Sequence, residues 1–145
     1  MAIIKIRIDT NNLERITVMS RLKYSVLRYS PSPLSGEQIN LGILFHDEES
    51  DYREFKFTQN FTRLAQFDDE LDIDMVQKLL IGIKDEFESK ETSKTIDIES
   101  YTRFYINAFH FDGIQSTSYD DVDETIEQLC KIYFRFDYIK SIRPE

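Results

Sequence analysis

The sequence predicts an α+β fold in which a mostly antiparallel sheet is packed by two main helices. Four stretches have the alternation and β-branched or aromatic content of strands, near residues 22–29, 38–46, 52–58 and 101–111. Apolar residues recur at spacings of three and four over about 72–89 and 121–135, which is the pattern of amphipathic helices. A length of 145 residues, 41% of them hydrophobic, fits a single domain with its own core.

The residue pattern of the N-terminal part predicts one strand, followed by a second element whose local signal is weaker. Residues 2–8 alternate and are rich in Ile, so we expect a strand there. A break follows at Asn11-Asn12, and residues 12–19 predict a weak helix or a turn. Residues 1–20 are therefore interpreted as an N-terminal extension of the domain.

Two hairpins are expected in the next part of the chain. Pro31, Pro33 and Gly36 connect the first two strands, because proline fixes φ and glycine permits positive φ. The short acidic link of residues 47–51 predicts an antiparallel hairpin between the second and third strands. The three strands together predict a meander.

The remaining elements follow from local signals. A short helix is expected over 60–67, a polar loop or edge element over 89–100, and a short strand over 114–118. Asp121, with Glu124 three residues later, resembles a capping box and marks the start of the last helix.

The composition excludes several classes of protein. No apolar run reaches the length of about 20 residues that a membrane span needs, so we expect a cytoplasmic protein without a membrane role. A net charge of −9 argues against direct nucleic-acid binding, which depends on Lys and Arg. Residues 1–30 carry a net +4 and the remainder −13. Either the basic part docks on the acidic body, or the acidic body faces a basic partner.

The usual catalytic and cofactor signatures are missing. The chain has no Gly-Lys-Ser/Thr phosphate loop, Gly-x-Ser-x-Gly elbow, Cys-x-x-Cys or His-Glu-x-x-His motif, and we expect neither a cofactor nor a metal. Cys130 lies on the apolar stripe of the last helix and is expected to be buried. His46 and His110 fall near the ends of different strands, and a shared site would require that these ends meet.

Acidic residues gather in two further places. We interpret them as solvated surface, together with helix capping for the second group, because the calcium-loop pattern is absent. They are Asp47, Glu48, Glu49 and Asp51 at the hairpin tip, and Asp68, Asp69 and Glu70 before the long helix.

The most informative segment runs from residue 28 to residue 42. Arg28 and Glu37 flank the connection of the first hairpin, where they could form a salt bridge, and Asn40 can bond nearby backbone. Gly42 inside a strand predicts close approach of another group. One interpretation is that these residues, with Tyr29, specify the hairpin; the other is that they form a binding surface.

This segment resembles the signature of a bacterial family known as domain of unknown function 3037. The residues that carry the resemblance are Tyr24, Val26, Arg28, Tyr29, Pro31, Gly36, Glu37, Ile39, Asn40 and Gly42. Two further pieces are similar, one around Arg103, Tyr105 and Ile114-Gln115-Ser116, the other around Glu124, Leu129 and Tyr133. The resemblance covers roughly residues 22–135. Phe109-His110-Phe111 departs from the family's Pro-Arg-Ser element, so the anion-binding role of that Arg does not carry over.

The resemblance implies a partner protein, because family members are often encoded beside a kinase-like protein of the toxin type. The leading hypothesis is a non-enzymatic interaction module, the small acidic partner or inhibitor of a larger protein in a toxin–antitoxin, phage-defence or counter-defence setting. The second is an acidic mimic of nucleic acid that blocks the basic groove of a nuclease. The third is a small-ligand or enzymatic domain that uses Arg28, Glu37 and Asn40.

Overall fold

The computed structural model confirms an α+β fold. It describes residues 2–8, 14–32, 34–90, 97–103, 105–106 and 108–138, and for 2–8, 14–20 and 105–106 it describes the backbone alone. In chain order the elements are β1 (Ala2–Ile8), β2 (Glu14–Tyr29), β3 (Ile39–Asp47), β4 (Tyr52–Phe57), α1 (Phe61–Phe67), α2 (Ile73–Glu88), α3 (Ile98–Tyr101), β5 (Tyr105–Ile106), β6 (Phe109–Phe111), β7 (Gln115–Ser118), α4 (Val122–Tyr133) and α5 (Arg135–Tyr138).

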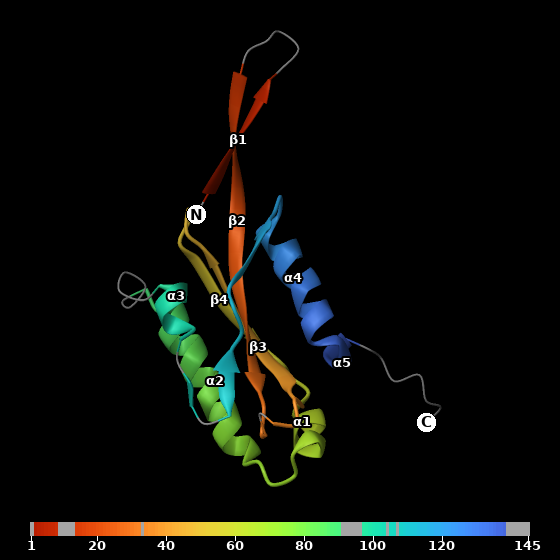
Figure 1. The fold of residues 1–145 in the computed structure, drawn as a ribbon. Helices are drawn as coiled ribbons and strands as arrows, with labels where there is room; N and C mark the ends of the chain where they lie inside the picture. Colours follow the sequence, from red (N-terminus) through yellow and green to blue (C-terminus); the bar gives the residue numbers. More distant parts are fainter. Residues whose placement is uncertain are drawn as a thin grey trace.

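Strand β2 organises the sheet (Figure 1). The strand order is β4-β3-β2-β6-β5, with β1 and β7 also paired to β2. Each of these pairs is antiparallel. The expected β2-β3-β4 meander is therefore confirmed, and most strands contact one long central strand.

The expectation of a helix or turn over 12–19 is wrong from Glu14 onward. Residues 14–20 form the first part of β2, where Ile4 of β1 lies opposite Val18 and Ile6 lies opposite Ile16. The ladder to β1 satisfies the backbone groups in an extended conformation, which overrides a weak local preference for helix. The break expected at Asn11-Asn12 lies outside the described residues.

The stretch from 97 to 111 is more divided than expected. Asp97 caps a short helix, α3, by accepting a hydrogen bond from the Ser100 N–H at 2.6 Å. The strand expected over 101–111 is present as two short strands, β5 and β6, which pair with each other. Much of the expected 89–100 loop, residues 91–96, lies outside the described residues.

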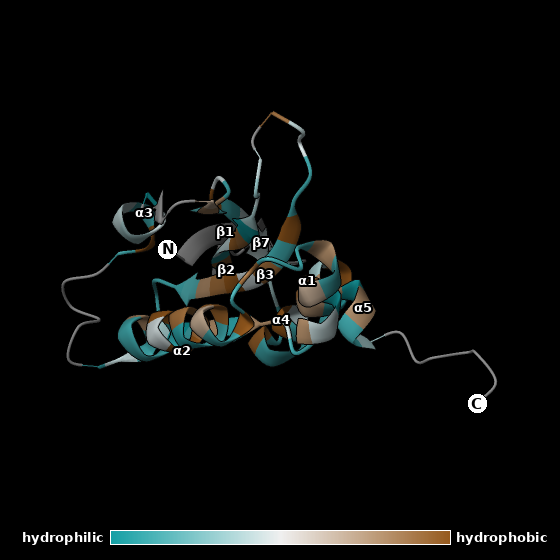
Figure 2. Ribbon diagram, turned by 90° about the horizontal axis from the view of Figure 1, so that it is seen from below, coloured by the Kyte–Doolittle hydropathy of each residue, from teal (hydrophilic) through white to brown (hydrophobic). Residues whose placement is uncertain are grey.

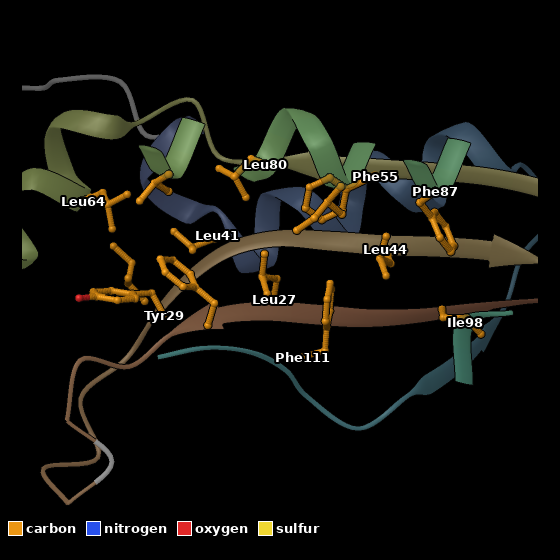
Figure 3. Packing of buried hydrophobic residues seen from close by; sticks show 14 residues of the cluster. Leu27, Tyr29, Leu41, Leu44, Phe55, Leu64, Leu80, Phe87, Ile98 and Phe111 are labelled. Atoms are coloured by element: carbon orange, nitrogen blue, oxygen red, sulfur yellow. The ribbon is translucent and has the colours of Figure 1, made fainter. Parts of the chain in front are cut away.

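Helices cover both faces of the sheet. On one face, Leu80 and Phe87 of α2 pack in one buried cluster with Leu44 of β3 and with residues of α1 and α3 (Figure 3). On the other face, Ile126 and Cys130 of α4 pack against strand residues of a second cluster. The sheet thus lies between two layers of helices, with α2 on one side and α4 on the other (Figure 1).

A β-bulge in β3 decides which residues meet on the α4 face. Leu27 lies opposite Gly42, but the next residue of β2, Arg28, lies opposite Asn40, so Leu41 is extra. A bulge of one residue reverses the alternation of side chains beyond it. Leu41 is consequently part of the core on the α2 side, while Ile43, two residues later, belongs to the cluster on the α4 side.

Gly42 allows this bulge to pack, and the predicted close approach at this residue is confirmed. A Cβ at position 42 would lie 2.4 Å from Cζ and 2.6 Å from Cε1 of Phe55. The Phe55 ring is 1% exposed and fills the space where another residue would carry its side chain. The Gly42–Phe55 contact is therefore a steric requirement of the fold.

Candidate functional site

The described part of the loop between β2 and β3, residues 30–32 and 34–38, projects from the body of the protein (Figure 2). Its tip is a hydrogen-bonded turn, in which the carbonyl of Ser32 accepts from the N–H of Ser35 at 3.2 Å and from its hydroxyl at 2.9 Å. Gly36 returns the chain with φ +73°, a conformation that suits glycine. Leu34 within this turn is 100% exposed. The loop therefore presents an apolar side chain directly to solvent.

The first stem of the loop is held by the Arg28 guanidinium. Its Nε donates to Oδ2 of Asp112 at 2.5 Å, and its second donor reaches Oδ1 of Asn40 at 2.9 Å. The Arg28 side chain is 20% exposed and that of Asp112 is 33% exposed. Asp112 is itself fixed, because its N–H donates to the Val26 carbonyl and its carbonyl accepts from the Ser25 hydroxyl. The ion pair thus joins β2 to the turn after β6.

Asn40 holds the second stem and caps a helix. Its Nδ2 donates to the carbonyl of Tyr133 at 3.0 Å, at the end of α4. The last carbonyls of a helix lack partners within the helix, so this bond satisfies one of them. The expected bond of Asn40 to nearby backbone is therefore wrong, because the bulge directs the side chain across the sheet towards α4.

Tyr29 fixes the stem on the opposite face. Its ring is 6% exposed, and its hydroxyl donates to Asp68 Oδ2 at 2.5 Å, next to the end of α1. Burial, reinforced by this carboxylate, raises the pKa of Tyr29 to about 12. One residue later, the N–H of Ser30 donates to the carbonyl of Ala108 at 2.9 Å. Both faces of the sheet thus contribute bonds that hold the loop.

Glu37 does not join this network, and the expected Arg28–Glu37 salt bridge is wrong. The guanidinium is taken by Asp112 and Asn40, and Glu37 is exposed. Its backbone carbonyl accepts a hydrogen bond from the Ser30 hydroxyl at 3.2 Å, which closes the base of the loop. Glu37 therefore places a solvated carboxylate beside the exposed tip.

The sequence did not reveal Asp112 as the partner of Arg28. Asp112 lies 84 residues from Arg28, after a strand whose pairing with β2 no local pattern indicates. The Asp112-Gly113 dipeptide signals a turn, and that was the only available signal at this position.

Alkaline pH should destabilise the protein through Tyr29 and Cys130. Burial raises the pKa of the Cys130 thiol to about 11, and Cys130 is confirmed as a buried residue. Both groups hold their protons more tightly in the folded chain, so stability should be constant below about pH 9 and fall between about pH 9 and 12. Thermal melts across this range test the prediction. Tyr29→Phe should make the decline shallower, and an unchanged profile in this variant would contradict the assignment.

The hairpin between β3 and β4 is less solvated than expected. Asp47 is 1% exposed, so its prediction as surface is wrong. Its carboxylate accepts from the Glu49 N–H, from the Ser50 hydroxyl at 2.8 Å and from the Tyr119 hydroxyl. This Asx-type arrangement builds the turn and ties it to the segment before α4.

The other acidic residues at this tip remain on the surface. Glu48 and Glu49 are exposed, and Glu48 forms an ion pair with Lys23. Asp51 has φ +56° and accepts bonds from His46 and Arg53, each at 3.0 Å. Burial opposes its ionisation, but these two bonds outweigh that effect and hold the pKa of Asp51 below its usual range.

The second acidic group is divided between two roles. Asp69 and Glu70 are exposed, as expected, whereas Asp68 is half-buried and accepts from Tyr29. The carboxylate that caps α2 is Asp72, which accepts from the Met75 N–H at 3.1 Å.

The two histidines do not form a joint site. His46 lies opposite Lys23 and packs on Phe87 of α2, whereas His110 lies opposite Arg28, further along β2. An open pocket of about 490 Å³ near His46 is lined by Ser50, Asp51, Tyr52, Arg53, Glu88 and Lys90. Among the described residues, no group of three or more side chains could hold a metal ion.

Comparison with known proteins supports the resemblance noted from the sequence. None of the described helices has the length and apolar content that crossing a membrane requires. No curated protein and no solved structure matches the chain. The family described as "Protein of unknown function (DUF3037)" matches residues 24–133, a span that begins in β2 and ends with α4. The chain therefore belongs to the DUF3037 family.

Proposed function

We propose that this chain is a non-enzymatic protein-interaction module whose primary contact is the loop of residues 30–38. In this proposal it is the small acidic partner or inhibitor of a larger protein, in a toxin–antitoxin, phage-defence or counter-defence setting. The carrying observation is Leu34, which is fully exposed at the tip of a loop whose stems are held by bonds from distant elements.

Hydrogen bonds at its stems order the loop before a partner binds. An exposed leucine gains free energy when a partner buries it, and a loop that is already ordered loses less conformational entropy on binding. The turn at Ser32–Ser35 and the anchors Arg28, Tyr29 and Asn40 provide that order. The polar groups of the family signature therefore support the loop from inside, and Leu34 and Glu37 are available to a partner.

The side chains at the tip indicate what kind of surface the partner would present. Leu34 requires an apolar pocket, and the exposed Glu37 beside it favours a basic residue at the rim of that pocket. The net charge of −9 would favour encounter with a basic protein surface. An enzymatic role for Arg28 and Asn40 is less well supported, because their polar atoms are engaged within the fold.

Co-purification from the host with three matched baits tests this proposal. The baits are the tagged wild-type chain, Leu34→Glu, and Ile81→Glu, which makes the same change at a half-exposed site on α2. We expect one protein to be retained by the wild type and by Ile81→Glu and lost from Leu34→Glu. The free energy of unfolding of both variants should lie within about 0.5 kcal/mol of the wild-type value, because both sites are on the surface. A partner retained equally by all three baits would contradict the assignment of the loop.

A further inference from the structure

The helix α5 lies beyond the span that the family matches, and the function proposed for the loop gives it no role. It follows α4 directly, because the chain turns at Phe134, whose φ of −113° and ψ of 47° are not helical, and continues as Arg135–Tyr138. Phe134 is 5% exposed and packs in the same cluster as Ile126 and Cys130 of α4. The end of α4 is thus fixed in the core, and α5 begins at a backbone turn beside it (Figure 1).

The Asp137 carboxylate holds α5 against the rest of the domain. Its Oδ1 accepts from the Thr58 hydroxyl at 2.6 Å, and its Oδ2 accepts from the Gln59 N–H at 2.7 Å. Both donors belong to the connection between β4 and α1. The ring of Phe136 also contacts the Arg63 guanidinium, with 4.2 Å from centroid to Cζ, but this ring is half-exposed. No residue of α5 is buried, so the attachment of this helix depends on Asp137.

A cavity of about 360 Å³ lies between β4, α4 and α5. Side chains of all three elements line it, among them Glu54, Lys56, Ile126, Cys130 and Tyr138. Every described lining residue except Tyr138 falls within residues 24–133, the span that the family matches. The family domain therefore builds the cavity, and α5 adds one wall to it.

The thiol of Cys130 is protected in this closed arrangement. The residue is 4% exposed, and burial raises the pKa of its thiol to about 11. Burial also raises the pKa of the Tyr138 hydroxyl, and the charge of the nearby Cys130 adds to that effect. A cysteine reacts as its thiolate, so a buried and protonated thiol is unreactive. Reaction at Cys130 then requires that the wall beside it move.

We propose that α5 is a strap that closes this cavity and controls access to the Cys130 thiol. Opening breaks the two bonds of Asp137 and turns the chain at Phe134, and it removes Tyr138 from the cavity wall. Segments that bury few apolar groups open locally at a lower cost in free energy than unfolding of the whole chain. The strap can therefore open while the sheet and α4 stay folded. It lies on a different element from the loop of residues 30–38, so the two proposals are independent.

Alkylation of the full chain by iodoacetamide measures how often the strap opens. Cys130 is the single cysteine of the sequence, and its thiolate displaces iodide, so the mass of the intact chain reports on this thiol alone. When closing is faster than alkylation, the rate is proportional to the population of the open state. Asp137→Ala should raise the rate about tenfold, because hydrogen bonds to a charged group favour the closed state by at least that factor.

Asp123→Ala is the matched control. Asp123 is another exposed carboxylate that lines the same cavity, but it belongs to α4 and takes no part in the bonds to Thr58 and Gln59. Its removal changes the net charge by the same amount and should leave the rate within about twofold of the wild-type value. Thr58→Val removes one of the two bonds from the opposite side, and it should speed alkylation by a smaller factor than Asp137→Ala.

Low concentrations of urea distinguish opening of the strap from unfolding of the whole chain. If α5 alone opens, the alkylation rate should change little up to about 1 M urea, whereas a route through global unfolding would become about tenfold faster. This comparison applies to Asp137→Ala even if that variant is less stable than the wild type. An Asp137→Ala rate equal to the wild-type rate overturns the proposal, and so does a rate that rises with urea as steeply as global unfolding.

Discussion

Replacing Arg28 with alanine is expected to lower the free energy of unfolding by about 2–3 kcal/mol, because hydrogen bonds to charged groups contribute that much and their loss leaves partners unsatisfied. The change removes the bonds to Asp112 and Asn40 together. It leaves a carboxylate that is one-third exposed, so the cost should stay below that of a fully buried pair. Urea unfolding measures this loss of free energy, and we expect the m-value to stay unchanged.

Glu37→Ala is the matched control for Arg28. Glu37 belongs to the same family signature and flanks the same loop, but it is exposed and lies outside the network. Its replacement should change stability by no more than about 0.5 kcal/mol. The double variant Arg28→Ala with Asp112→Ala should cost less than the sum of the single changes, since the two residues share one ion pair. Equal, small effects of Arg28→Ala and Glu37→Ala would instead assign Arg28 to a binding surface.

Gly42→Ala is expected to destabilise the protein by about 3 kcal/mol, the upper range for added volume in a packed core. The new methyl group would overlap the Phe55 ring at 2.4 Å. The ring cannot yield easily, because Phe55 is buried and its backbone N–H donates to the Glu88 carboxylate at 2.8 Å. The bulge that positions Asn40 should be disturbed at the same time.

Gly82→Ala provides the control for Gly42. A Cβ at position 82 meets no atom within 4 Å beyond its chain neighbours and the backbone of its own helix, α2. Alanine there should stabilise the protein by about 0.5–1 kcal/mol, because it favours the helix over the unfolded chain. Combining Gly42→Ala with Phe55→Leu should recover part of the loss. A neutral Gly42→Ala would show that the strand can shift away from Phe55.

The sequence predicted well the elements that depend on local patterns. The apolar spacing of α2, the alternation of β3 and β4 and the cap at Asp121 arise from interactions within a few residues, so the chain displays them directly. The role of Gly42 was also predictable, since a glycine inside a strand indicates that a neighbouring group lies too close for a side chain. The N-terminal residues from Glu14 were predicted incorrectly because the ladder to β1 decides their conformation.

Tertiary structure alone decided what the residues of the segment from 28 to 42 do. The sequence by itself identified Arg28, Tyr29 and Asn40 as a group, but their partners Asp112, Asp68 and Tyr133 come from distant elements. The bulge at Leu41 determines the face on which Asn40 lies, and a shift of one residue would have placed Leu41 opposite Arg28. Pairing between β2 and β3 sets this register, and periodicity within one strand cannot specify it.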